Sequence, residues 1–264
     1  WADIRIVKPY IGGGFGNKQD ALYEPLCAWC CTQVGGRCVR IDCAREETFV
    51  SNRVRHAIRF HIVTWLHGDG TLAARRVKAF VNCGAYTTSA LVMLDHSVYG
   101  LSGNYRNPNL LVDAYGIYTN TQFNGPYRAL GCELFVYAVE RNLDMAAERL
   151  GIDKYEIRRR NVLHLGDIDG HGQVVTSNGS AEALEAAAKY IKFNEPARPA
   201  EGPWRYGKGL ALGNKFTAYG HTGTEANVII QHDDTIEVHV SHVEMGQGSM
   251  TVDCQHVAEF FKVP

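Results

Sequence analysis

The stretch "GGGFGNKQD", residues 12–20, contains the first residues whose types and spacing could do chemistry. Glycines leave backbone N–H groups bare, so an anionic or oxo-bearing group can approach them closely. Phe15 could form a wall for a flat ligand, or it could be the buried side chain of a tight turn; composition leaves both open. The spacing excludes a P-loop and a dinucleotide fingerprint, because Asn17 stands where each pattern needs a glycine.

Two later loops also lead from an extended stretch into a helix. In "NGPYRALGCE" (124–133), Arg128 precedes a predicted helix, where a guanidinium can bind phosphate or an oxo ligand. The alternative is a surface arginine that caps a neighbouring helix. In "HVEMGQGSMT" (242–251), the glycines around Gln247 predict free amides beside a side chain that both donates and accepts. Each loop alone is weak evidence. We expect the three loops to converge on one cleft.

The elements that must position these loops follow an α+β pattern. Residues 2–8 and 37–43 predict strands on either side of a helix over 20–34, and residues 56–86 predict a hairpin with its turn at Gly68–Gly70. A further strand is predicted over 109–120, and further β-stretches over 206–219, 224–232 and 235–243. Helices are predicted over 131–150, directly after Asp153, over 181–192 and from residue 249.

A polar, glycine-rich connector near residues 165–180 predicts a domain boundary. We therefore expect a first unit over residues 1–166. A second unit over residues 181–264 ends on a helix without closing elements, so it is expected to be incomplete.

Composition excludes several classes of protein. Of 264 residues, 45% are hydrophobic and the net charge is -1, so no basic excess points to nucleic acid. No apolar run is long enough for a membrane span, and no export signal is present, which predicts a cytoplasmic protein with reduced thiols. Cys27, Cys30 and Cys31 share one helical face. Without a second cysteine pair, buried metal-free thiols are favoured over a redox pair or half a zinc site.

Three segments together carry a resemblance to a known family: "GGGFGNK", "PYRALGCELFVYAVERNLDMAAERLGIDKYEIRRRNVLHLGD" and "VEMGQGSMT". They resemble the molybdenum-binding large subunit of the xanthine dehydrogenase/aldehyde oxidase family, in the same order along nearly the whole chain. The resemblance implies a molybdenum-cofactor-binding α+β domain with mixed sheets and packed helices. It also implies part of a hydroxylase that oxidises a small N-heterocycle or aldehyde with water-derived oxygen.

The cofactors and site residues follow from the resemblance alone. It implies a molybdenum-pterin cofactor, in bacteria often the cytosine dinucleotide form, and [2Fe-2S] and FAD partner domains or subunits. Gly14, Phe15 and Gly16 would lie beside the molybdenum oxo group. Arg128 would contact the cofactor, and the backbone around Gln247 would contact the pterin or its phosphate. The full set of implied cofactor-binding residues is Gly14, Phe15, Gly16, Arg128, Gly246, Gln247 and Gly248.

The departures from the family concern the substrate side. Gln19 replaces the glutamate of the xanthine enzymes, His96 stands about where they carry a substrate arginine, and Leu130 replaces an aromatic residue. Thr217 matches a retained pocket threonine. The resemblance therefore does not imply that xanthine is the substrate of this protein.

No residue of this chain is assigned as catalytic. The family's general-base glutamate is expected beyond Pro264, and Glu244 belongs to the cofactor loop. We expect the isolated chain to be inactive and to hold the cofactor weakly or not at all. The alternative functions are a non-catalytic nucleotide-binding module and a scaffold that contacts an iron-sulfur partner.

Overall fold

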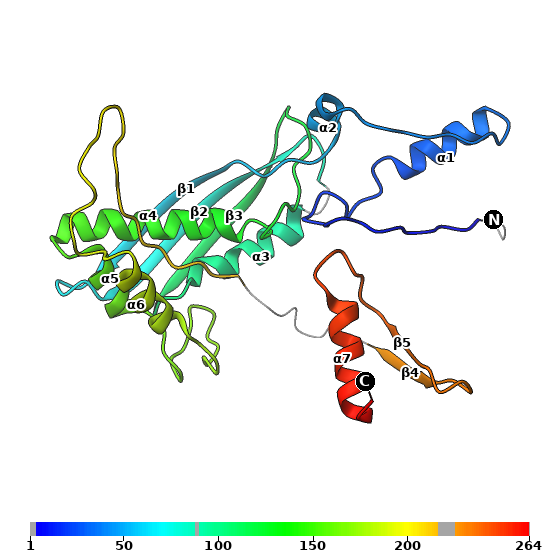
Figure 1. Cartoon of the computed structure of the whole chain (residues 1–264). Helices are drawn as coiled ribbons and strands as arrows, with labels where there is room; N and C mark the ends of the chain where they lie inside the picture. The colour runs from blue at the N-terminus through cyan, green and yellow to red at the C-terminus, as the bar shows by residue number, and fades with distance from the viewer. Residues whose placement is uncertain (1–3, 88–89, 216–224, 264) are drawn as a thin grey trace. The chain divides into compact units, whose positions relative to one another are not determined.

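The structure is a computed structural model that describes residues 4–87, 90–215 and 225–263. The described residues form two compact units: residues 4–20 with 225–263, and residues 21–215. The larger unit contains a three-stranded sheet and the helices α1 to α6, while the smaller contains a two-stranded sheet and α7 (Figure 1). The predicted α+β class is confirmed.

The sheet of the larger unit begins with the predicted hairpin. Strands β1 (Ile58–Leu66) and β2 (Leu72–Gly84) pair antiparallel, and in their turn the Asp69 carboxylate accepts the Thr71 amide at 2.9 Å. Strand β3 (Leu110–Tyr118) lies parallel to β2 at the other side. A parallel pair needs a crossover connection, and helix α3 (Ala90–Ser102), which the sequence analysis missed, provides it.

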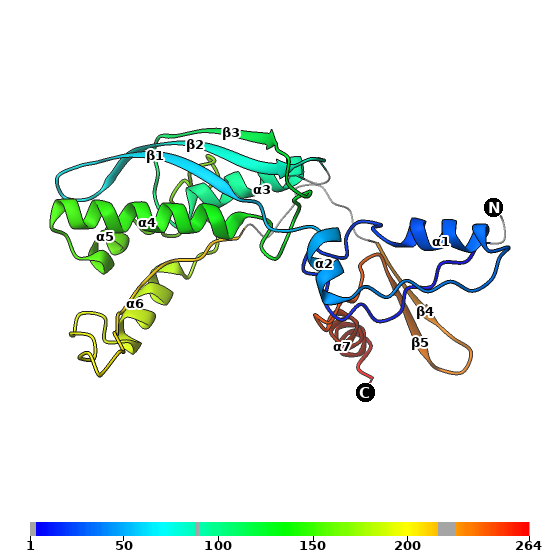
Figure 2. The same cartoon turned by 90° about the horizontal axis from the view of Figure 1, so that it is seen from above.

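Helices α3 and α4 cover one face of this sheet, as Figure 2 shows. Helix α4 (Cys132–Leu150) confirms the predicted helix, and its buried stripe includes Phe135, Val139 and Leu143. These side chains form one core with Val77 of β2. Burying an apolar side chain of this size stabilises a fold by about 1.5–3 kcal/mol.

Helices α5 (Lys154–Asn161) and α6 (Ser180–Tyr190) follow α4. The predicted cap is confirmed, because Asp153 Oδ1 accepts the amides of Tyr155 and Glu156 at 2.8 and 3.1 Å. Leu184 of α6 belongs to the same core as α4, so that core continues past the segment where the sequence predicts a boundary. The bounds 1–166 and 181–264 stay a prediction for the domains of the complete protein.

The expected burial of the three cysteines is wrong. Helix α1 (Glu24–Gln33) has no buried residue, and Cys27, Cys30 and Cys31 are half-buried free thiols. The returning segment 37–43 covers the cysteine face only in part: Cys27 Sγ donates to Val39 O at 3.4 Å and Cys31 Sγ to Arg37 O at 3.1 Å.

Three predicted strands are absent from the described residues. Within residues 4–8, 37–43 and 206–215 the chain forms no strand ladder. An extended segment becomes a strand only where a neighbour takes up its hydrogen bonds. Helix α2 (Arg45–Ser51), after the second of these segments, was not predicted.

The smaller unit confirms the predicted C-terminal elements. Strands β4 (Ala226–Ile230) and β5 (Ile236–Val240) pair antiparallel, and helix α7 (Ser249–Phe261) follows. Among the helices that the structure describes, none combines the length and apolar character that a membrane crossing requires.

Candidate functional site

The structure brings the first and third predicted loops together in the smaller unit. The Gly13 amide donates to Met245 O at 2.8 Å, and Lys8 Nζ donates to Glu244 O at 3.3 Å across 236 positions of sequence. A Cβ atom at Gly14 would lie 2.7 Å from Met245 Sδ. The two loops therefore form one hydrogen-bonded platform.

The first loop has an unusual backbone. Gly13 and Gly16 have φ of 94° and 96°, and Phe15 between them has φ of 47°, a region that side chains rarely adopt. A Cβ at Gly13 would lie 2.4 Å from the Phe15 ring, so that ring requires glycine there. Phe15 is 59% exposed, which excludes the alternative of a buried phenylalanine. Lys18 closes the loop by donating from Nζ to Gly13 O at 3.0 Å.

The third loop is closed by a carboxylate that the sequence analysis did not foresee in this role. Glu244 Oε1 accepts the amides of Gly246 and Gly248 at 2.5 and 3.2 Å, and Oε2 accepts the Ser249 hydroxyl at 2.8 Å and the Met250 amide at 3.3 Å. The expectation of free amides is wrong for these residues. Glu244 instead occupies the positive end of α7, where a negative charge is stabilised.

Gln247 braces the same loop from its other side. Its Oε1 accepts the Met245 amide at 2.6 Å, and its Nε2 donates to Val243 O at 2.8 Å. Both polar ends of the side chain are thus used to shape the turn.

Glu244 gives a first testable prediction. The hydrogen bonds from Ser249 and then from the Gly248 amide lower its pKa from 4.5 to about 2. Because the folded pKa is depressed, the cap stabilises α7 above pH 4.5 and is lost as the pH falls from about 4.5 towards 2. We expect the Gly248 and Met250 amide chemical shifts to stay constant between pH 6 and 4.5 and to move with a midpoint near 2. A midpoint near 4.5 would refute the cap, and Glu244→Gln is the control without this titration.

In the larger unit, the Arg128 loop contains three successive left-handed residues. Ala129, Leu130 and Gly131 have φ of 75°, 57° and 85°, directly before α4. Helix α3 holds this run, because Ser97 Oγ donates to Leu130 O at 3.0 Å. His96 directly precedes Ser97 in α3. The bond between Ser97 and Leu130 therefore joins the helix that carries His96 to the loop that carries Leu130.

A strap formed by residues 52–56 holds the same loop, and the sequence analysis missed it. The Gly125 amide donates to Val54 O at 3.2 Å, and Arg55 Nη1 donates to Arg128 O at 3.2 Å. His56 Nδ1 lies 2.6 Å from the Asn82 carbonyl, which ties the strap to β2. The available signal was "NRVRH", basic residues placed directly before a strand.

The remaining predicted residues have separate outcomes. Gln19 is exposed at the end of the first loop, and Thr217 lies outside the described residues. Arg128 belongs to the larger unit and both glycine loops to the smaller. Convergence of all three loops therefore stays a prediction.

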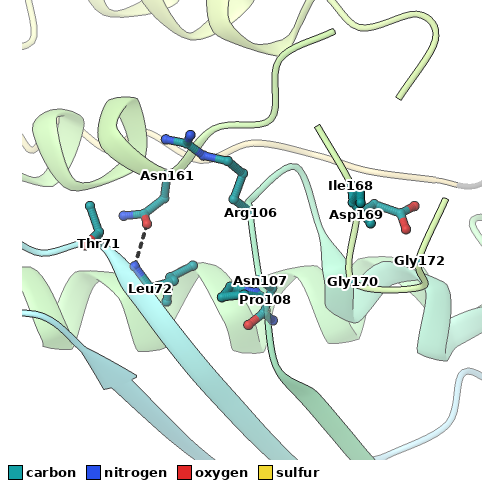
Figure 3. Close-up of a pocket in the computed structure, with 10 residues that line it drawn as sticks. All are labelled: Thr71, Leu72, Arg106, Asn107, Pro108, Asn161, Ile168, Asp169, Gly170 and Gly172. Atoms are coloured by element: carbon teal, nitrogen blue, oxygen red, sulfur yellow. Dashed lines mark hydrogen bonds between the residues drawn. The ribbon is translucent and has the colours of Figure 1, made fainter. Parts of the chain in front are cut away.

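A cavity of about 600 Å³ in the larger unit has none of the predicted site residues among its described lining (Figure 3). Asn161 helps to build its wall: Oδ1 accepts the Leu72 amide at 2.7 Å, and Nδ2 donates to Gly70 O at 2.8 Å. These bonds attach the β1–β2 turn to α5. Asn161, the asparagine of the motif "EIRRRNVL", thus has a structural role in packing the turn against the helix.

The donors of each loop decide which kind of group that loop can bind. Among the residues that the structure describes, no three His, Cys, Asp or Glu side chains are grouped to hold a metal ion. In the larger unit, the guanidinium of the Arg128 loop suits phosphate and oxo groups. In the smaller unit, the glycine loops bring main-chain polar groups to the surface of the platform, which suits polar ring edges. The residues fit a cofactor that brings its own metal ligands.

Comparison with known proteins agrees with this donor set. Two models described as "Molybdopterin cofactor-binding domain" match residues 1–162 and 183–264. The chain is 36% identical over its whole length to a putative xanthine dehydrogenase molybdenum-binding subunit of Escherichia coli (strain K12), and it spans 36% of that relative. It is 32% identical over 70% of its length to the nicotinate dehydrogenase large molybdopterin subunit of Eubacterium barkeri, of which it spans 43%.

Solved structures show the same fold. The aldehyde oxidoreductase from Desulfovibrio gigas matches 87% of the chain with a TM-score of 0.68 at 22% identity, over 26% of its own length. Quinoline 2-oxidoreductase from Pseudomonas putida 86 matches 70% of the chain with a TM-score of 0.61 at 25% identity, over 24% of its length. The chain therefore belongs to the molybdopterin-binding subunits of the xanthine dehydrogenase/aldehyde oxidase family.

Proposed function

We propose that this chain is the part of a molybdenum hydroxylase that holds the pterin-bound molybdenum with two glycine loops and one arginine loop. The observation that carries the proposal is the bond between the Gly13 amide and Met245 O, because it makes two distant cofactor motifs into one platform. When bound, the cofactor supplies the redox centre at which oxygen is transferred to an electrophilic carbon.

The residues of this chain would then bind and orient the cofactor. The backbone of the Gly14–Gly16 loop would lie beside the oxo group of the metal, while the Met245 side chain packs against Gly14. The Met245–Gly248 turn, shaped by Glu244 and Gln247, would present its edge to the pterin. Arg128 would neutralise cofactor charge with a forked set of donors. Glu244 is a poor proton acceptor at neutral pH, because its pKa is about 2.

The substrate and the partners extend this proposal. We assign Gln19, His96, Leu130 and Thr217 to the substrate side of the site, with an N-heterocycle or an aldehyde as the substrate class. The general base would be a glutamate outside this chain. Iron-sulfur and FAD domains or subunits would carry the electrons away, the pterin would be of the molybdopterin or cytosine dinucleotide form, and the enzyme would work in the cytoplasm. Residues 1–166 and 181–264 would form two domains of the complete protein.

The proposal is tested by Gly14→Ala in the complete enzyme. Gly14 has an ordinary φ, so alanine is tolerated by the backbone, but the added methyl group would displace the Met245 thioether and shift the two glycine loops against each other. Because a misplacement of about 1 Å at a reacting centre can cost about a hundredfold in rate, we expect turnover to fall roughly tenfold or more. The measurement combines turnover with molybdenum and pterin content per chain.

Gly209→Ala is the matched control. Gly209 also has an ordinary φ, and a Cβ there would meet nothing within 4 Å, so activity should be unchanged. An unmodified enzyme without stoichiometric molybdenum and pterin would refute the proposal, and so would full activity of Gly14→Ala.

A further inference from the structure

Arg55 lies outside every motif that carries the proposed function, yet it contacts the Arg128 loop at three points. Its Nη1 donates to Arg128 O at 3.2 Å, and its guanidinium carbon lies 4.8 Å from the centre of the Tyr127 ring. It also forms an ion pair with Glu133 in the first turn of α4. One side chain thus binds the chain before and after the left-handed run.

That run needs support from its surroundings. Ala129 and Leu130 are non-glycine residues with φ of 75° and 57°, and consecutive left-handed residues are unfavourable for L-amino acids. Strained backbone persists only where neighbouring structure over-determines it. Ser97 holds the middle of the run through Leu130 O, and Arg55 holds both ends.

The chemistry of the guanidinium suits this position. A planar group with five donors can bond a carbonyl and a carboxylate in its plane while its face covers an aromatic ring. The side chain is 33% exposed, so these contacts are partly shielded from water. A lysine ammonium has neither the plane nor the fork.

We propose that Arg55 is a positioning residue that fixes the left-handed run of residues 129–131 and thereby aims Arg128 at the cofactor. The effect on the run stands on the contacts above. The effect on the cofactor rests on the proposed function of Arg128.

The test uses the complete enzyme with Arg55→Ala, Arg55→Lys, Arg128→Ala and the double variant Arg55→Ala/Arg128→Ala. Arg55→Ala should weaken cofactor binding about tenfold, which corresponds to about 1.4 kcal/mol of binding free energy, and so lower molybdenum and pterin content; Arg55→Lys should restore only a part. Since Arg55 acts through Arg128, the double variant should lose no more than Arg128→Ala alone. Additive losses would overturn the proposal.

Hydrogen exchange at the amides of Cys132 and Leu134, which donate to Ala129 O and Gly131 O at 3.1 and 3.0 Å, gives a readout that does not depend on the cofactor. We expect it to be at least tenfold faster in Arg55→Ala and unchanged in Arg59→Ala, an exposed arginine of the following strand. If Arg55→Ala does not fold, the exchange rates of Arg55→Lys are compared with those of Arg59→Ala instead. Rates in Arg55→Lys equal to those of the unmodified enzyme would overturn the proposal.

The two proposals fail in different ways. If Arg128→Ala keeps its cofactor, the proposed role of Arg128 falls, and with it the cofactor part of this inference, whatever the exchange rates are. If Arg128→Ala loses cofactor while Arg55→Ala keeps both cofactor and slow exchange, this inference alone is wrong.

Discussion

Replacing Arg128 by alanine in the complete enzyme is expected to weaken cofactor binding about 10- to 100-fold and so to lower molybdenum and pterin content, without unfolding the protein. Hydrogen bonds to charged groups contribute about 1.5–3 kcal/mol, and each 1.4 kcal/mol is a tenfold change in affinity. Arg128 lies at the start of a loop whose backbone is held by Arg55 and Ser97, and these contacts stay in place when the Arg128 side chain is removed. Metal analysis and pterin fluorescence measure the loss.

The conservative variant separates charge from geometry. Arg128→Lys keeps the positive charge but not the fork, so it should recover only part of the cofactor. Circular dichroism and thermal unfolding serve as controls for folding. Full cofactor content in Arg128→Ala would contradict the assignment of this loop to the cofactor.

Replacing Arg158 by alanine is expected to destabilise the larger unit by about 3–5 kcal/mol, the usual cost of leaving a buried charge without its partner. Arg158 is completely buried, and its Nε donates to Glu140 Oε2 at 2.7 Å. Burial alone would lower the pKa of Arg158, but the charge of Glu140 raises it above its ordinary value. Tyr105 donates to the other oxygen of Glu140 at 2.6 Å, so the carboxylate depends on both residues.

The neighbouring arginine provides a matched control. Arg159 also forms an ion pair, with Glu156 at 2.7 Å, but its side chain is 56% exposed. Exposed pairs contribute about 0–1 kcal/mol, so Arg159→Ala should change the urea midpoint little. Equal destabilisation by the two variants would show that the buried network does not hold the core together.

Elements with strong local patterns could be predicted from the sequence. The hairpin around Gly68–Gly70 and helix α4 have clear period-2 and 3.6-residue patterns, and the Asp153 cap precedes its helix directly. Helix α3 was missed although Met93, Ser97 and Leu101, spaced by four, form one buried face. The strands over 2–8 and 37–43 were over-predicted because a pattern cannot show whether a pairing partner exists.

The loops of the candidate site were predicted from their motifs, whereas the contacts between these loops were not. The bond between Gly13 and Met245 joins residues far apart in the sequence, and spacing holds no information about such a pair. The role of Glu244 was missed because its carboxylate reaches α7 from four positions before the N-cap residue Gly248, outside the usual capping patterns. Arg55 was missed because its partners, Arg128 and Glu133, are distant in sequence.

The hydrogen bond between Lys8 and Glu244 O, across 236 positions, also has a consequence for biosynthesis. Closing so long a loop costs entropy that is repaid only when both ends are present, and domains generally fold as units while the ribosome is still at work. The larger unit, whose residues are contiguous, can acquire its core during translation. The first glycine loop must wait, unpaired, until the segment around Met245 has left the ribosome. The platform is therefore a late product of folding, and a ribosome stalled before Met245 would carry a nascent chain with a native larger unit but no ordered glycine platform.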